Sequence, residues 1–205
     1  MIRAFIAVEL SEALRAGLTI LQQTMKRRIE PEVTREAHLS WVKPASIHLT
    51  LKFLGDMNEQ LIDPLRAAIK LAIGTQLVIS VPLAQLGAFP RPHNPRVLWV
   101  GPSEEWERGR DAKRVLDIQQ AIEQACEGFG FAREARPFSP HLTVLRIKKG
   151  ERHVGLAFAK SGLGDRPLTV GSLVVEAVVL MQSELRPTGP VYTKLWEVRL
   201  GCPAA

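Results

Sequence analysis

The chain has 205 residues, of which 46% are hydrophobic and 23% are charged. These fractions are close to those of an average globular domain, so they exclude a disordered, collagen-like or coiled-coil chain. The longest apolar stretches, 77–84 and 173–181, fall short of the roughly eighteen residues that a membrane-spanning helix needs. The formal net charge of +6 favours a polyanionic partner such as nucleic acid or a phosphate ester.

The start of the chain and the cysteines bear on its compartment. The segment Met1 to Ile6 passes directly into a strand-like run, without the pattern of a signal peptide, so we expect a cytoplasmic protein. Cys126 and Cys202 are too few and too far apart for a disulfide framework or a zinc site. We expect Cys126 in the core, on the apolar face of a helix, and Cys202 in a loose tail.

The first half of the chain predicts strands and helices in alternation. Ser11 is a good N-cap for the helical spacing of leucines that follows it, and Gly55 ends the most strongly alternating strand. In chain order we predict a strand over 2–10, a helix over 12–27, a loop over 28–40, a strand over 46–54 and a helical stripe from Leu61 to Ala72.

The second half repeats this alternation after a proline-rich loop over 89–95. Two β-rich segments, 77–87 and 96–100, flank that loop. We then predict a helix over 104–127, a strand over 141–147, a short helix over 151–159, and strands over 167–183 and 191–199.

One short segment occurs twice, at positions 93 residues apart. Ser46-Ile47-His48-Leu49-Thr50-Leu51 resembles Ser139-Pro140-His141-Leu142-Thr143-Val144, and each copy lies in a strand between two helices. No linker rich in Pro, Gly or Ser would part the chain into independent domains. We therefore predict one domain over residues 1–205, in which two similar, pseudo-symmetric lobes bring their related strands to a central cleft.

The repeated tripeptide His-Leu-Thr carries the chemistry. Side chains at i and i+2 of a strand share a face, so His48 pairs with Thr50 and His141 with Thr143. Two imidazoles and two hydroxyls suit a phosphodiester: the hydroxyls donate to non-bridging oxygens, while one imidazole takes a proton and the other gives one. The ordinary imidazole pKa of about 6.5 allows one neutral and one protonated ring near neutral pH.

A zinc site and a pair of core histidines are the alternatives to a phosphodiester site. Two histidines from separate strands are compatible with zinc, but neither motif contains the carboxylate or cysteine that would complete the site, so we expect no metal. A single His-x-Thr is most simply a histidine that hydrogen-bonds to backbone within the core. The duplication argues against a core role here.

With these motifs the sequence resembles the two-histidine phosphoesterases, and most closely the RNA 2′,3′-cyclic phosphodiesterases of the LigT or ThpR type, once called 2′-5′ RNA ligases. The resemblance covers nearly the whole chain. It rests on residues 3–10, 41–44, 48–55, 86–90, 95–101, 136–143, 183–185 and 189–192. It implies an α+β fold of two lobes, with antiparallel sheets facing a central cleft and helices on the outside.

The resemblance also extends both motifs by three residues, to Phe53 and Arg146. It implies that Arg146 grips the phosphate and that Phe53 stacks on the terminal base. Positions 48 and 53 differ by an odd number, as do 141 and 146, so a regular strand would point these side chains away from the histidines. Either a bulge or the end of the strand must bring them back.

By analogy with the family, we expect metal-independent hydrolysis of RNA 2′,3′-cyclic phosphate ends to 2′-phosphate, without a cofactor. His48 would be the acid toward the ribose O3′ and His141 the base toward water, although the sequence itself does not order the two roles. The expected partner is RNA with a 2′,3′-cyclic phosphate terminus, and the expected state is a monomer. The alternatives are ligation or cleavage of 2′-5′ linkages, hydrolysis of another small cyclic nucleotide, or a non-catalytic RNA-end binding module.

Overall fold

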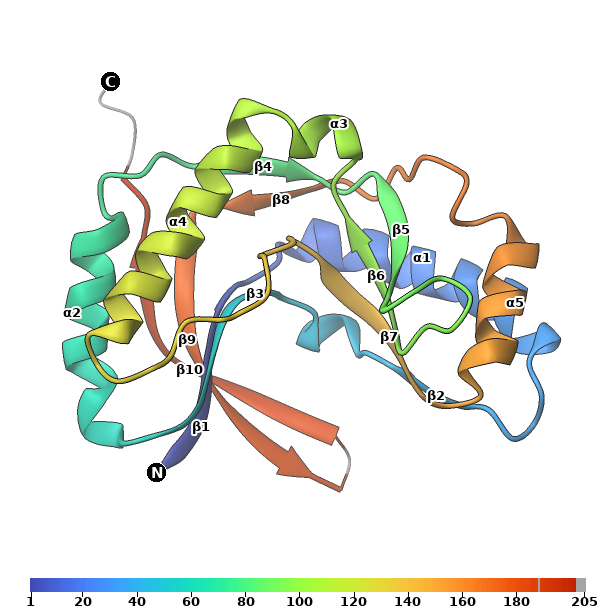
Figure 1. The fold of residues 1–205 in the computed structure, drawn as a ribbon, viewed down its shortest axis with the longest axis horizontal. Coiled ribbons are helices and arrows are strands. Elements are labelled where there is room, and N and C mark those ends of the chain that lie inside the picture. The colour runs from blue at the N-terminus through green and yellow to red at the C-terminus, as the bar shows by residue number, and fades with distance from the viewer. Residues whose placement is uncertain (188, 202–205) are drawn as a thin grey trace.

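The computed structural model describes residues 1–187 and 189–201 (Figure 1). The first half contains β1 (Ile2–Val8), α1 (Glu12–Ile29), β2 (His38–Trp41), β3 (Leu49–Met57) and α2 (Ile62–Ile73). The second half contains β4 (Ile79–Pro82), β5 (Gln85–Phe89), β6 (Val97–Gly101), α3 (Glu104–Glu107), α4 (Arg110–Glu127), β7 (Leu142–Lys149), α5 (Glu151–Ser161), β8 (Ser172–Val175), β9 (Ala177–Arg186) and β10 (Gly189–Arg199). Short 3-10 helices cover Glu30–Glu32, Pro44–Ser46 and Glu59–Leu61.

The structure corrects several of the predicted elements. The predicted strand over 46–54 begins at Leu49 and runs past Gly55 to Met57, and the segment 77–87 is divided between β4 and β5, which belong to different sheets. The predicted loop over 28–40 ends in β2, a four-residue strand that pairs with the edge of β7 and is too short to show a clear alternation. The predicted helix over 104–127 is two helices, because the backbone of Gly109 is extended and caps α4. The predicted strand over 167–183 divides into β8, which pairs with β4 in a separate sheet, and β9.

Within the described part of the chain, eight strands form one antiparallel sheet with the order β10-β9-β1-β3-β7-β6-β5, and β2 adds to β7. Strands β3 and β7 meet at the single pair Leu49 and Leu142, so the sheet consists of two halves joined at one point. In Figure 1, α2 and α4 lie beside the half that contains β1, and α1 and α5 lie beside the half that contains β7. The predicted α+β fold, with two antiparallel lobes and outer helices, is confirmed.

The strands divide their side chains between two faces. Ala4, Ile6 and Val8 of β1 enter the main core with the helices, whereas Phe5 and Ala7 point the other way into a small second cluster. Helix α1 begins at its N-cap Ser11, whose hydroxyl accepts from the amide of Leu14, as predicted. The burial of each large aliphatic side chain on the apolar face of α1 contributes about 1.5–3 kcal/mol to the free energy of folding.

The longer helices, α1, α2, α4 and α5, lie on the outside of the sheet and pack their apolar faces into the main core. No helix in residues 1–187 or 189–201 is long and apolar enough to cross a membrane. Cys126 is buried in the core on α4, as predicted, and burial raises the pKa of its thiol to about 12. The predicted loose tail thiol, Cys202, lies outside the described residues.

Candidate active site

The two motif histidines lie at the junction of the two sheet halves. His48 immediately precedes β3 and His141 immediately precedes β7. The next residue of each strand, Leu49 or Leu142, is 1% exposed and faces the core. Since side chains alternate, the histidines point to the opposite face of the sheet.

The register between β3 and β7 brings all four predicted motif side chains to that face. Leu49 and Leu142 are antiparallel partners, so the same register sets His48 opposite Thr143 and Thr50 opposite His141. All four are partly exposed. We call the face that carries them the site face.

A bulge in β3 brings Phe53 to the site face as well. Ala7 of β1 pairs with Thr50 and Ile6 pairs with Lys52, so Leu51 has no partner on β1. Phe5 then pairs with Phe53, so Phe53 and Thr50 oppose residues that share a face of β1. Phe53 is 63% exposed.

Strand β7 has the same bulge at the corresponding position. Trp99 of β6 pairs with Thr143 and Val97 pairs with Arg146, while the register passes over Val144. Arg146 therefore shares the site face with Thr143, and its side chain is exposed. The burial patterns of β3 and β7 are identical over their first eight residues. Of the two solutions to the parity problem, the structure has the bulge in both strands.

Backbone carbonyls fix both imidazole rings. Nδ1 of His48 lies 2.9 Å from the carbonyl oxygen of Ser46, and Nδ1 of His141 lies 2.8 Å from that of Ser139. A carbonyl only accepts, so Nδ1 carries the proton and donates it to the carbonyl. The other ring nitrogen, Nε2, is therefore the one that exchanges a proton in each motif.

Aromatic side chains pack around His48. The ring of Phe5 stacks on it with centroids 4.6 Å apart and an angle of 28° between the planes. The ring of Tyr192 meets it edge-on at 5.2 Å and also contacts Phe5. These contacts confine the imidazole to one orientation.

His141 has an equivalent aromatic wall in the other lobe. Phe89 meets the imidazole edge-on at 5.0 Å, and Trp99 lies 6.2 Å away between ring centroids. A Cβ atom on Gly87 would lie 2.1 Å from Cζ2 of Trp99. Only glycine at this position leaves room for the indole in its present place.

Burial and one cation set the protonation of the site. Burial lowers the pKa of His48 to about 4, against the hydrogen bond to Ser46, and the charge of Arg146 lowers it further. Burial likewise lowers the pKa of His141, against its bond to Ser139, and Arg146 again adds to the effect. Burial raises the pKa of Tyr192, whereas Arg146 lowers it. Arg146 therefore lies within electrostatic reach of all three rings.

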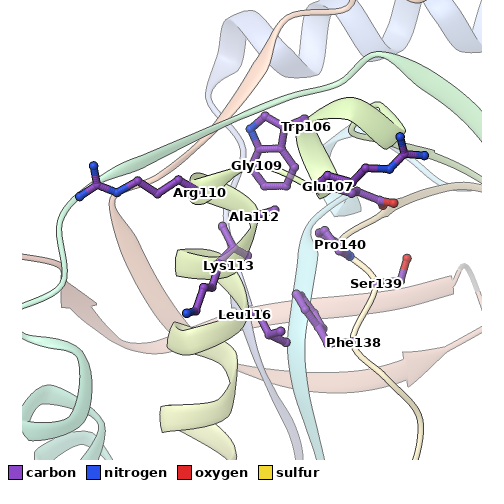
Figure 2. Close-up of a pocket in the computed structure, with 12 residues that line it drawn as sticks. Trp106, Glu107, Gly109, Arg110, Ala112, Lys113, Leu116, Phe138, Ser139 and Pro140 are labelled. Carbon is purple, nitrogen blue, oxygen red and sulfur yellow. The ribbon is translucent and has the colours of Figure 1, made fainter.

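A surface pocket of about 660 Å³ lies beside residues 138–140, which directly precede His141 of the second motif (Figure 2). Figure 2 shows Leu116 of α4 facing Phe138 and Pro140, beneath Trp106. The pocket touches Ser139, whose carbonyl accepts a hydrogen bond from His141, but its lining comes from α3, α4, the two residues between these helices and residues 138–140. As for metals, the described residues contain no group of three or more His, Cys, Asp or Glu that could hold an ion.

The sequence matches the family described as LigT like Phosphoesterase over residues 8–99 and 110–192, and these ranges include both motifs. The chain belongs to this family. The resemblance that the two motifs suggested is thereby confirmed.

Relatives of the LigT-like chain match it over most of its length. A Methanothermobacter thermautotrophicus protein named RNA 2′,3′-cyclic phosphodiesterase is 32% identical over 199 residues, which cover 97% of this chain and 99% of the relative. An Aeropyrum pernix protein of the same name is 36% identical over 160 residues, which cover 77% and 84%. The crystal structure of E. coli LigT complexed with 3′-AMP shares the fold, with a TM-score of 0.69, 23% identity and coverage of 97% and 98%.

Sequence reasoning missed three aromatic residues of this LigT-like site. Phe5, Phe89 and Trp99 belong to the segments that carry the resemblance, but on their own strands they read only as core residues. Their signal was the alternation of β1, β5 and β6, which places an aromatic on the face opposite the main core. The exposed His38, His93 and His153 do not belong to this aromatic-walled site.

Proposed function

We propose that this protein hydrolyses the 2′,3′-cyclic phosphate at RNA ends to a 2′-phosphate by general acid and base catalysis without a metal ion. One observation carries the proposal: two His-x-Thr motifs share one face, and each imidazole is fixed through Nδ1 with Nε2 available for proton transfer. Full-length relatives named RNA 2′,3′-cyclic phosphodiesterase support the same activity.

The phosphate would be held by three groups on the site face. The hydroxyls of Thr50 and Thr143 donate to the non-bridging oxygens, and the guanidinium of Arg146 binds them in a bidentate manner. Arg146 also stabilises the negative charge that builds up as water attacks phosphorus. The bulge in β7 that sets Arg146 on the same face as Thr143 supports this placement.

The two histidines would act in sequence on one phosphorus atom. Nε2 of His141 takes the proton of a water molecule as its oxygen forms a bond to phosphorus. The bond from phosphorus to O3′ breaks, and Nε2 of His48 gives its proton to O3′, which leaves a 2′-phosphate and a free 3′-hydroxyl. The lowered pKa of His141 keeps this base neutral near pH 7. His48 needs the negative charge of the bound phosphate to raise its pKa before it can serve as acid.

Phe53 would stack on the terminal base. Its ring is 63% exposed on the site face and lies 6.2 Å from that of Phe5, which backs His48. A base placed there is next to the ribose whose O3′ leaves. Stacking accepts any base, so we expect little preference for the terminal nucleotide.

Comparing substrates tests the activity against its alternatives. Purified protein in EDTA is incubated with an oligoribonucleotide that ends in 2′,3′-cyclic phosphate, with a 2′-5′-linked oligonucleotide, and with a small cyclic mononucleotide. We expect the first to be converted fastest, to a 2′-phosphate end. Faster turnover of the 2′-5′ linkage, or binding of RNA without any turnover, would contradict the proposal. Loss of activity in EDTA would contradict metal independence.

We further propose that the chain folds as one domain of two pseudo-symmetric lobes and acts as a monomer in the cytoplasm. The matching burial patterns of β3 and β7 support the pseudo-symmetry. A single unfolding transition and a monomeric mass in light scattering are the expected results. Two separate transitions or a dimeric mass would contradict the respective proposal.

A further inference from the structure

In each of the two bulges, one in β3 and one in β7, one residue has no pairing partner on the neighbouring strand. In β3 this residue is Leu51, which is 3% exposed, and in β7 it is Val144, which is fully buried. Their carbonyl groups lie at the two places where the ladder is irregular. A buried carbonyl without a hydrogen bond costs roughly 1–3 kcal/mol, so each bulge needs a donor.

Two donors reach the bulge carbonyl of β7, the backbone amide of Val42 and the side chain of Gln22 on α1. The side chain of Gln22 is 5% exposed and lies among the apolar residues of that helix. Nε2 of Gln22 donates one hydrogen bond of 2.9 Å to the carbonyl of Val144 and another of 2.7 Å to the carbonyl of Val42. The amide of Val42 in turn donates to the carbonyl of Val144. One buried amide thus ties the bulge to the chain that leads into the first motif.

The donor for the bulge of β3 is Gln119 of α4. It is 6% exposed, and its Nε2 donates at 3.4 Å to the carbonyl of Leu51 and at 3.1 Å to Oε1 of Glu123. Glu123 also pairs with Lys52, the residue that follows the bulge, with Nζ and Oε2 2.7 Å apart. In each lobe, therefore, a buried glutamine on a helix that covers the sheet donates a hydrogen bond to the carbonyl of the bulge residue.

We propose that Gln22 and Gln119 are positioning residues of the site. Each glutamine holds a bulge, and each bulge turns the sixth residue of its motif, Arg146 or Phe53, onto the site face. In a regular strand that residue would point to the opposite face from the motif threonine. A buried amide is costly in a core unless its hydrogen bonds compensate, and here both N–H groups of each amide are used. Gln22 acts through Arg146 on phosphate binding, and Gln119 acts through Phe53 on base binding.

A double-mutant cycle in each lobe tests this assignment, which rests on the proposed function. Gln22→Met keeps the length of the side chain and removes its donors. We expect kcat/KM for the cyclic phosphate substrate to fall by about 10- to 100-fold, as for a displaced catalytic group. In an Arg146→Ala background the same change should cost less than about twofold, because the group it positions is gone. Gln23→Met, at the exposed neighbouring position, is the matched control and should leave the rate unchanged.

The second cycle pairs Gln119→Met with Phe53→Ala, and Gln120→Met, also exposed, is its control. Here the effect should fall on KM, while kcat changes little. The crossed pair, Gln22→Met with Phe53→Ala, should be additive. Additive effects within both matched pairs would overturn the proposal, because a merely structural glutamine weakens the enzyme whatever stands at position 146 or 53. Wild-type kcat/KM in both glutamine variants would overturn it as well.

Folding of the variants and the activity itself are checked separately. If Gln22→Met does not fold, Gln22→Asn, which keeps a shorter amide, replaces it. If no variant of either glutamine yields a folded protein, the glutamines serve stability and the proposal is overturned. If the wild type shows no turnover, the proposed function fails, and the cycle is then measured on the dissociation constant for inorganic phosphate. That constant should still rise in Gln22→Met only when Arg146 is present.

Discussion

The buried ion pair between Lys52 and Glu123 predicts a large stability change from one substitution. The two side chains are 2% and 7% exposed, and Nζ of Lys52 lies 2.7 Å from Oε2 of Glu123 and 2.7 Å from the carbonyl of Ala132. Lys52→Met leaves the carboxylate of Glu123 buried without its counter-ion. Breaking a pair of this kind costs about 3–5 kcal/mol.

This cost translates into a measurable shift in thermal unfolding. For a chain of this length, each kcal/mol lowers Tm by about 2–4 °C, so we expect Lys52→Met to lower Tm by about 6–20 °C. Adding Glu123→Gln removes the unpaired charge and should restore at least about 2 kcal/mol. The control is Lys160→Met, which breaks a 2.7 Å pair with Glu32 whose side chains are 73% and 45% exposed. That variant should lose less than about 1 kcal/mol.

The free energies of unfolding come from urea titration of the wild type and the four variants, which also include Glu123→Gln alone. If Lys52→Met proves as mild as Lys160→Met, the burial assigned to this pair is wrong. If the double variant is less stable than Lys52→Met, the charge of Glu123 is not the source of the cost.

Three further predictions concern the site. Both site histidines have lowered pKa values in the free protein, so the optimum of the bell-shaped pH profile of kcat/KM should lie below the ordinary imidazole pKa of about 6.5, and Arg146→Gln should shift this optimum to higher pH. An optimum above pH 7 would contradict the assigned pKa directions. Phe53→Ala should raise KM for an oligoribonucleotide by about 5- to 100-fold, as expected for a lost base stack, with little change in kcat in steady-state assays, and an unchanged KM would exclude stacking. Gly87→Ala should displace Trp99 and cost about 1–3 kcal/mol in urea titration together with a lower kcat, and a variant as active and stable as the wild type would refute the close packing.

The sequence was sufficient to predict the shared face of the motif residues. His48 and Thr50 follow from strand parity alone, and so do His141 and Thr143, because the period of a strand is a local property. Parity also showed that Phe53 and Arg146 required a bulge or a strand end. It did not show which, since the bulges depend on Gln22 and Gln119, which are far from the motifs along the chain.

The rest of the site comes from strands that sequence patterns do not pair. Phe5 reaches His48 from β1, and Phe89 and Trp99 reach His141 from β5 and β6. Each of these aromatics fits a core position equally well until the sheet order is known. The edge strand β2 was missed for a related reason, because it depends on pairing with β7 more than on its own four residues.

The most direct test of the two-histidine mechanism measures kcat/KM in EDTA for the wild type, His48→Ala and His141→Ala on an RNA end with a 2′,3′-cyclic phosphate. Each substitution removes one proton transfer, so each variant should lose about 10²- to 10⁴-fold in rate. The exposed His153→Ala should keep the wild-type rate, and the wild-type product should be a 2′-phosphate. Activity within about threefold of wild type in either His48→Ala or His141→Ala, a change smaller than any proton-transfer role allows, would contradict the mechanism.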